Sequence, residues 1–283
     1  MNKIIACIDG SAINNAVCDA TCWVAQRLEK PILLLHTLER NQRQNTDDLS
    51  GAIGLGAQTE LLEKMAQLDE ERAQLALRYA KALVHQFEQN IRAAGCDQVS
   101  SLLRHGDFVE ALVELEADAR FMVVGKSGQD HAQELTALGS HIETLIRQVH
   151  TSILIAPHVF EPPTNFMLAY DGRETADRSL ERVIKGGLLQ GLECHLVMVR
   201  NDNHANEEAL KRAQDRMEAE GYSVKTSLLD GPIFESLQQY QRAQSINFLI
   251  MGAFGHSKIR RMFLGSNTIR MIQSASIPLV VLR

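Results

Sequence analysis

The sequence contains one pattern of segments twice, and this duplication restricts the chain to folds built from two similar halves. A short apolar run closes on Asp9 and Gly10, and a second one closes on Asp171 and Gly172. Segments with helical periodicity follow at 14–29 and 174–187. Later segments repeat too, since 101–112 resembles 227–237 and 120–125 resembles 247–252. A repeat this long is a duplicated domain, because solenoid repeats span only ~20–50 residues.

A proline-rich stretch separates the two copies. Residues 157–164 include the adjacent Pro162 and Pro163, which cannot enter a central strand and disfavour helix before them. The chain of 283 residues is about twice the ~150 residues expected of one domain. We therefore predict two domains, 1–157 and 164–283.

Within each copy, apolar strand-like runs alternate with helix-length amphipathic segments, in an order that predicts five strands. Uninterrupted apolar runs indicate strands that are covered on both faces. Strand and helix alternation then predicts a parallel, doubly wound α/β sheet in each half. Ligands of such sheets bind at the carboxyl ends of the strands, near the point where the strand order reverses.

Composition restricts the class of partner. A net charge of −6 does not favour non-specific electrostatic binding to nucleic acid or to an anionic membrane. The apolar runs fall short of the ~20 residues that span a bilayer, and no secretion signal opens the chain. Five scattered cysteines without a CxxC pair are typical of a reduced, cytoplasmic protein.

The first half is longer than the second. We predict a mobile loop over 41–56 and a long helix over 59–92. The glycines at 51–56 do not follow a strand, which argues against a dinucleotide fingerprint and favours a lid or an interface element.

The most informative motif lies at 251–268. Gly252 ends a buried strand, and Gly265 with Ser266 lies where a helix should begin, so backbone amides and the positive helix end would converge there. Three cations, Lys258, Arg260 and Arg261, lie between the glycine pairs without an acidic residue among them. This arrangement suits a polyphosphate.

The spacing Gly252-x2-Gly255-x9-Gly265-Ser266 resembles the ATP-binding pattern of the universal stress protein family, in its tandem two-domain form. The resemblance covers both halves and implies two tandem adenine nucleotide alpha hydrolase-like domains, each with a five-stranded parallel sheet. It also implies ATP as the ligand, with Mg²⁺ as an optional companion. The residues that it implies for nucleotide binding are Asp171, Val199, Gly252, Gly255, His256, Gly265, Ser266 and Asn267.

The first half departs from this pattern. Ten residues rather than nine separate Gly128 from Gly139, and they include Asp130 and Glu134 but no cation. Two carboxylates near a triphosphate would repel it, so we expect the second half to be the better site. A second candidate site in the first half comprises Asp9, Gly125, Gly128, Gly139 and Ser140.

Structural explanations compete for several of these residues. Asp9 and Asp171 could cap the next helix, Ser266 could be an ordinary N-cap, and the three cations could form a solvated face. The pair Cys18 and Cys22 has a spacing compatible with metal ligands but is expected to pack in the core. We expect His36 and His195 to be core histidines as well.

The sequence contains no Walker loop, no nucleophile elbow and no zinc-protease helix, so we assign no catalytic residues and no metal ligands. The functional hypotheses therefore rest on the glycine motif. The leading hypothesis is a cytoplasmic stress-response protein that binds ATP as a regulatory module with unknown protein partners. A slow ATPase or nucleotidyl-transferring enzyme and a scaffold without nucleotide are the alternatives. The apolar edges at 153–156 and 279–282 predict a pseudo-two-fold pairing of the halves. A homodimer through the long first-half helix stays open.

Overall fold

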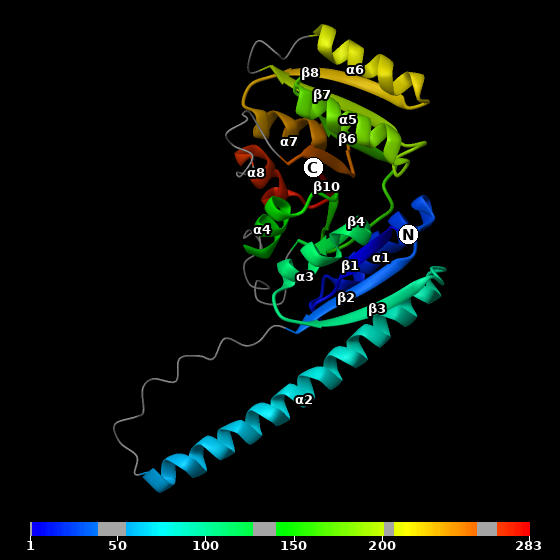
Figure 1. The fold of residues 1–283 in the computed structure, drawn as a ribbon. Helices are drawn as coiled ribbons and strands as arrows, with labels where there is room; N and C mark the ends of the chain where they lie inside the picture. The colour runs from blue at the N-terminus through cyan, green and yellow to red at the C-terminus, as the bar shows by residue number, and fades with distance from the viewer. Residues whose placement is uncertain (1, 39–54, 127–139, 201–206, 254–264) are drawn as a thin grey trace.

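The computed structural model describes residues 2–38, 55–126, 140–200, 207–253 and 265–283. Strands and helices alternate along the chain in each half (Figure 1). The elements of the first half are β1 Lys3–Cys7, α1 Asn14–Leu28, β2 Ile32–Leu38, α2 Leu55–Ala93, β3 Val99–His105, α3 Phe108–Leu115, the short 3₁₀ helix Glu116–Asp118, β4 Ala119–Gly125, α4 Ser140–Gln148 and β5 Ile153–Ala156. Those of the second half are β6 Asn165–Ala169, α5 Glu174–Gly186, β7 Glu193–Arg200, α6 Glu207–Ala219, β8 Ser223–Asp230, α7 Ile233–Ala243, β9 Leu249–Gly252, α8 Ser266–Ser274 and β10 Leu279–Leu282.

All ten of these strands form one sheet in the order β3-β2-β1-β4-β5-β10-β9-β6-β7-β8. The five strands of each half pair in parallel with one another, and the two halves have the same internal order. The predicted pair of doubly wound, five-stranded parallel sheets is therefore confirmed. The domain limits at 157 and 164 stay a prediction.

The two halves meet through the last strand of each. β5 and β10 pair antiparallel, with Leu154 opposite Val280. Both residues are the second residue of their strand, so the pair relates equivalent positions of the repeat and marks a pseudo-two-fold axis. This confirms the predicted pairing of the halves along the two apolar strands.

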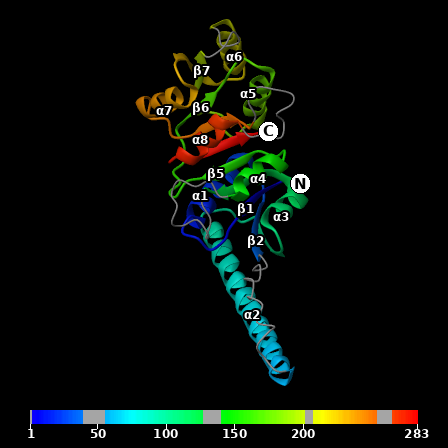
Figure 2. The same cartoon turned by 90° about the vertical axis from the view of Figure 1, so that its left-hand side faces the viewer.

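Two hydrophobic clusters cover the sheet, one on each face, and each continues from one half into the other. Leu154 and Val280 belong to the cluster that contains α1 and α5. Their strand neighbours Ile153 and Val281 belong to the cluster that contains α4 and α8. Alternate residues of each strand thus face opposite layers of helices, which explains why the strand runs are apolar throughout. Figure 2 shows these helices around the β5 and β10 region.

Aromatic side chains fill one end of the seam between the halves. The Trp23 ring lies 5.5 Å from that of Phe248 and 5.9 Å from that of Phe160, between ring centroids. Arg27 lies over the Trp23 ring and its Nε donates a hydrogen bond of 2.6 Å to the Leu188 carbonyl of the second half. α1 therefore holds the second half by packing and by a charged donor together.

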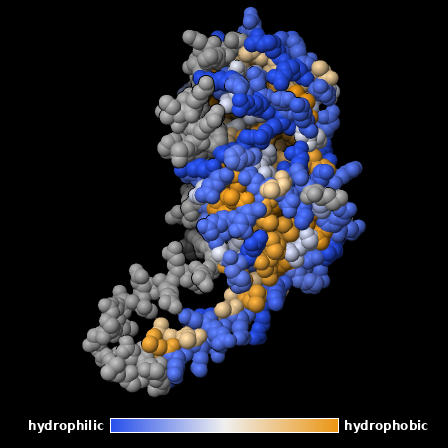
Figure 3. Space-filling model, viewed as in Figure 1, coloured by the Kyte–Doolittle hydropathy of each residue, from blue (hydrophilic) through white to orange (hydrophobic). Residues whose placement is uncertain are grey.

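Helix α2 begins at Leu55, so Leu55 and Gly56 are helical and the loop prediction over 41–56 is wrong for these two residues, while 41–54 lie outside the described residues. Its sequence is rich in residues with high helix propensity, which supports a long helix. The far end of α2 extends away from the body of the first half in both views (Figures 1 and 2). Figure 3 shows hydrophobic surface that continues onto this helix, where Leu68, Leu75 and Tyr79 are exposed. A homodimer through α2 stays a prediction.

In the described part of the chain, no helix combines the length and apolar character needed to cross a bilayer.

The cysteines and the two strand histidines are core residues. Cys18 and Cys22 are buried, and burial raises the pKa of the Cys18 thiol to about 12, which keeps it protonated and unreactive. His36 Nδ1 lies 2.7 Å from the Ile8 carbonyl oxygen, and His195 Nδ1 lies 3.0 Å from the Tyr240 hydroxyl. The prediction that these residues serve packing is confirmed.

We predict that Trp23→Ala lowers the free energy of unfolding by about 3–5 kcal/mol, because it empties the space between the rings of Phe160 and Phe248. Urea denaturation followed by circular dichroism measures this. As a control, Val159→Ala removes an exposed side chain of the neighbouring linker and should change stability by no more than about 0.5 kcal/mol. Equal stability of the two variants would contradict the assigned role of Trp23.

Candidate functional site

The candidate site of the second half lies where its strand order reverses. From β6 the chain moves outward to β7 and β8, whereas β9 lies on the other side of β6. The carboxyl ends of β6 and β9 are therefore neighbours that border the crevice in which open α/β sheets bind ligands. Asp171 follows β6 and Gly252 ends β9, so both lie at this edge.

The two ends of the glycine motif lie together. The Gly265 amide donates to the Ala253 carbonyl at 3.4 Å, and the Thr268 hydroxyl donates to the Gly252 carbonyl at 3.3 Å. A Cβ on Gly252 would lie 3.4 Å from Ser179 Oγ, so α5 packs directly against this glycine. The two ends of the motif therefore lie side by side at this edge of the sheet.

Helix α8 begins at this point without a side-chain cap. Gly265 is the N-cap residue and supplies no side-chain hydrogen bond, and the first turn contains no acidic residue. The alternative that Ser266 is an ordinary N-cap is wrong, because Ser266 is already the first helical residue and is exposed. Asn267 follows it and is half-buried. The first backbone amides of a helix have no intrahelical partner, so this end of α8 favours an anion.

Asp171 stabilises a turn rather than a helix cap. Its Oδ1 accepts a hydrogen bond of 3.1 Å from the Arg173 amide, and Gly172 has a φ of +74°, which glycine adopts without strain. Asp9 does the same in the first half, where it accepts from the Ser11 amide and Gly10 has a φ of +88°. The N-cap residues of α1 and α5 make no side-chain cap bond, so the capping alternative is wrong for both aspartates.

Val199 lies near the end of β7, beyond the part of β7 that pairs with β6. That pairing ends at Ala169 opposite Val197, and the Tyr170 amide then donates to the Val197 carbonyl at 2.9 Å. Residues two apart on a strand point their amide and carbonyl groups to the same side. The backbone of Val199 therefore faces the crevice beyond β6, as a hydrogen-bonding edge for a planar ligand requires.

The remainder of the motif lies outside the described residues. These positions are Gly255, His256, Lys258, Arg260 and Arg261 in the second half and Gly128 and Gly139 in the first. Their roles, including the alternative that the three cations form a solvated face, stay predictions.

The equivalent edge of the first half is partly covered by α2. A Cβ on Gly10 would lie 2.9 Å from the Tyr79 hydroxyl and 3.7 Å from a methyl group of Leu83. Gly125 ends β4, and Ser140 is the first residue of α4. The ammonium of Lys126, next to Gly125, donates to the Ala275 carbonyl of the second half at 2.7 Å, and burial lowers its pKa.

Sequence reasoning missed three residues that shape these edges. Thr268 ties α8 to β9, Ser179 contacts Gly252, and Tyr79 covers Gly10. The first two follow from tertiary packing and leave no local pattern. Tyr79 had a signal, since it is an aromatic residue on the extra helix of the longer half.

Within the described residues, no group of three or more histidine, cysteine, aspartate or glutamate side chains could hold a metal ion. A magnesium ion that accompanies a nucleotide needs few protein ligands, because phosphates and water supply most of its coordination.

These features define a tandem α/β protein whose second half brings the ends of β6 and β9 next to an uncapped helix at the point where the strand order reverses. A sequence model described as "Universal stress protein family" matches residues 1–157 and 199–283, and the chain belongs to this family. The curated Universal stress protein Slr1230 of Synechocystis sp. is 29% identical over 287 residues, 100% of both chains.

Solved structures show the same fold. A universal stress protein from Archaeoglobus fulgidus superposes with a TM-score of 0.74 at 19% identity, over 100% of this chain and 98% of the other. A protein described as a putative universal stress protein from Pseudomonas aeruginosa gives a TM-score of 0.62 at 13% identity, over 100% and 93%. The tandem form is thus shared along the full chain.

We predict that Thr268→Val lowers the free energy of unfolding by about 1 kcal/mol. The substitution keeps the shape of the side chain but removes the hydroxyl that donates to the Gly252 carbonyl. Urea denaturation measures the loss, and faster hydrogen exchange of the first α8 amides would locate it. Thr175→Val, at an exposed position of α5, is the matched control and should leave both unchanged. Identical behaviour of the two variants would refute the link between α8 and β9.

Proposed function

We propose that the second half binds ATP in the crevice between β6, β9 and α8, and that the protein is a nucleotide-dependent regulatory module of the cytoplasmic stress response. One observation carries the proposal: the Gly265 amide and the Thr268 hydroxyl bond to Ala253 and Gly252, which joins both ends of the glycine motif at the switch point of the sheet. The proposed unit is the domain 164–283.

The triphosphate would bind at the start of α8. Its first amides have no side-chain cap, its first turn holds no carboxylate, and the positive end of the helix dipole points there. Gly265, which has no side chain, would let phosphate oxygens approach the backbone at the start of α8. Gly255, His256, Asn267 and the three cations at 258–261 complete the proposed cradle, with Mg²⁺ on the phosphates when present.

The nucleoside would lie across the ends of β6 and β7. The backbone of Val199 faces the crevice and offers one donor and one acceptor to the edge of adenine. Asp171 is half-buried after β6, and its second carboxylate oxygen would accept a hydrogen bond from a ribose hydroxyl.

We propose weaker binding for the first half, with Asp9, Gly125, Gly128, Gly139 and Ser140 as its candidate residues. Tyr79 and Leu83 lie where a ligand would cross the Gly10 turn. The sequence between Gly128 and Gly139 also supplies two carboxylates and no cation.

Two other functions use the same fold. A slow ATPase or nucleotidyl-transferring enzyme would consume the bound nucleotide, and incubation with Mg²⁺ over hours followed by chromatography of the nucleotide distinguishes it from a binding module. A scaffold would bind protein partners without nucleotide. The absence of ATP binding by the wild-type chain would favour the scaffold.

The sharpest test introduces a carboxylate at the start of α8. Ser266→Glu should weaken ATP binding about tenfold or more, because a charge ~4 Å from a phosphate costs up to ~4 kcal/mol before screening. A glutamate in the first helical turn stabilises the helix, so loss of binding would not reflect unfolding. Equilibrium dialysis with labelled ATP measures the affinity.

Ser140→Glu, at the equivalent first residue of α4, is the matched control and should leave the affinity nearly unchanged. A second pair, Gly252→Val and Gly125→Val, fills the end of β9 or of β4 with a side chain. Stronger effects in the first-half variants would move the site to the first half. Equal affinity in all five proteins would refute the nucleotide proposal.

A further inference from the structure

The seam between the halves has two ends that the pseudo-two-fold axis relates, and only one of them is filled. Counted from the aligned Asp9 and Asp171, Trp23 of α1 and Lys185 of α5 both lie fourteen residues further on. Trp23 packs on Phe248 and closes its end. Lys185 lies at the other end, next to a cavity of about 560 Å³ whose lining includes Phe121, the counterpart of Phe248 in the repeat.

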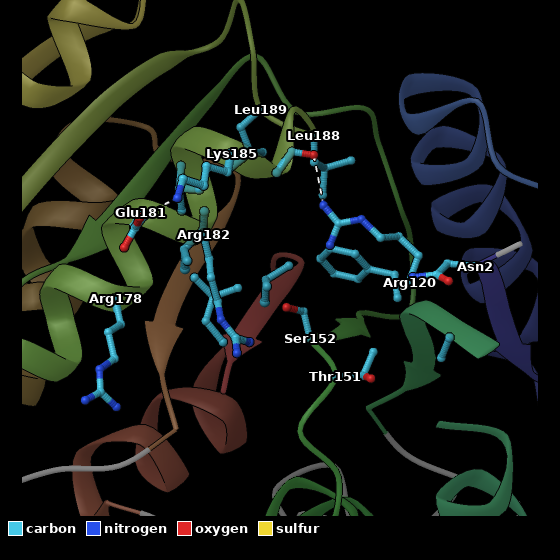
Figure 4. A pocket seen from close by; sticks show the side chains of 17 residues that line it. Asn2, Arg120, Thr151, Ser152, Arg178, Glu181, Arg182, Lys185, Leu188 and Leu189 are labelled. Atoms are coloured by element: carbon cyan, nitrogen blue, oxygen red, sulfur yellow. Dashed lines mark hydrogen bonds and ion pairs between the residues drawn. The ribbon is translucent and has the colours of Figure 1, made fainter. Parts of the chain in front are cut away.

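The cavity has a cationic lining over an apolar base. Four cationic side chains and one carboxylate line it, and Figure 4 shows them on α5 and at the start of β4: Arg120, Arg178, Arg182, Lys185 and Glu181. Phe121, Val280 and Leu282 are buried apolar residues among the lining. The volume lies within the ~300–1,000 Å³ that small-molecule sites occupy.

Two of the arginines donate across the seam to backbone carbonyls. Arg120 donates to the Gly186 carbonyl at 3.2 Å, and Arg182 donates to the His150 carbonyl at 3.4 Å. Lys185 and Arg178 instead pair with carboxylates of their own helix, Glu181 and Glu174. A guanidinium has five donors, so Arg120 and Arg182 keep donors for an anion between them.

Ser152 supplies an independent sign of a ligand. Its residue is only 7% exposed, and its hydroxyl makes no hydrogen bond within the part of the chain that the structure describes. Figure 4 shows this hydroxyl pointing into the cavity, toward the side where Arg182 lies. Because this hydroxyl points into the cavity and bonds to no described residue, it can donate to an oxygen of a bound ligand.

Further cationic charge lies beside the cavity. The pKa of the Arg283 guanidinium is lowered by burial and, among nearby charges, by Arg182, while Glu116 acts in the opposite direction. Arg283 therefore adds a cation near Arg182, with the carboxylate of Glu116 as its stronger charged neighbour.

We propose that this cavity binds a small organic anion, with its phosphate or carboxylate group held by Arg120, Arg182 and Ser152 and its apolar body against Phe121, Val280 and Leu282. Among the described residues, none of those proposed for ATP lines the cavity. The site therefore takes a second ligand, at a place where a ligand contacts both halves at once.

Calorimetric titration of the full chain with phenyl phosphate and with benzoate tests this, and uncharged benzyl alcohol is the matched probe. At least one anion should bind measurably more tightly than benzyl alcohol, and the better anion identifies the headgroup. Arg182→Gln should weaken that binding about tenfold. Arg212→Gln removes one charge from an exposed ion pair on α6 and should have no effect.

Lys185→Trp places tryptophan at the counterpart of Trp23 and should abolish binding by filling the cavity, while the exposed position of Lys185 allows the chain to fold. Ser266→Glu, at the exposed start of α8, should leave anion binding unchanged, because Ser266 does not line the cavity. The proposal is overturned if neither anion binds, if Arg182→Gln and Lys185→Trp bind as the wild type does, or if Ser266→Glu alone removes binding, which would place the anion in the nucleotide crevice.

Discussion

The antiparallel pairing of β5 with β10 is the interaction on which the rest of the molecule depends. Each half ends its sheet on a short strand whose residues are apolar on both faces. Left unpaired, such an edge exposes backbone donors and acceptors together with apolar side chains. Pairing the two edges satisfies the backbone and joins both hydrophobic layers across the seam, so that one continuous sheet supports two crevices.

This pairing also determines how the halves can differ. Because Leu154 pairs with its own counterpart Val280, the two ends of the seam begin as equivalent places. The linker passes only one of them and contributes Phe160, which packs with Trp23. The other end has cationic residues on α5 and remains hollow. The duplicated architecture therefore has a seam with one end filled by side chains and the other end open as a cavity.

Much of the fold was predictable because it rests on local pattern. Apolar strands, Asp-Gly turns and the repeat indicated both sheets and their pairing, and the glycine spacing indicated that Gly252 and Gly265 meet. Local pattern failed where tertiary contacts decide. The alternative that Asp9 and Asp171 cap the next helix was wrong, because each carboxylate accepts a hydrogen bond from the amide two residues further on. The seam cavity was not predictable, because it depends on which side chain each helix places over the opposite half.

The same reasoning explains why the halves need not share a ligand. In the first half the crossover from β2 to β3 contains the long helix α2, and Tyr79 and Leu83 of that helix lie over the Gly10 turn. In the second half the corresponding crossover contains the much shorter α6, which begins at Glu207 and packs along β8. One insertion therefore changes access to the first crevice without altering the sheet below it. Lys126 adds a constraint, since its bond to the Ala275 carbonyl links the end of β4 to the residue that follows α8.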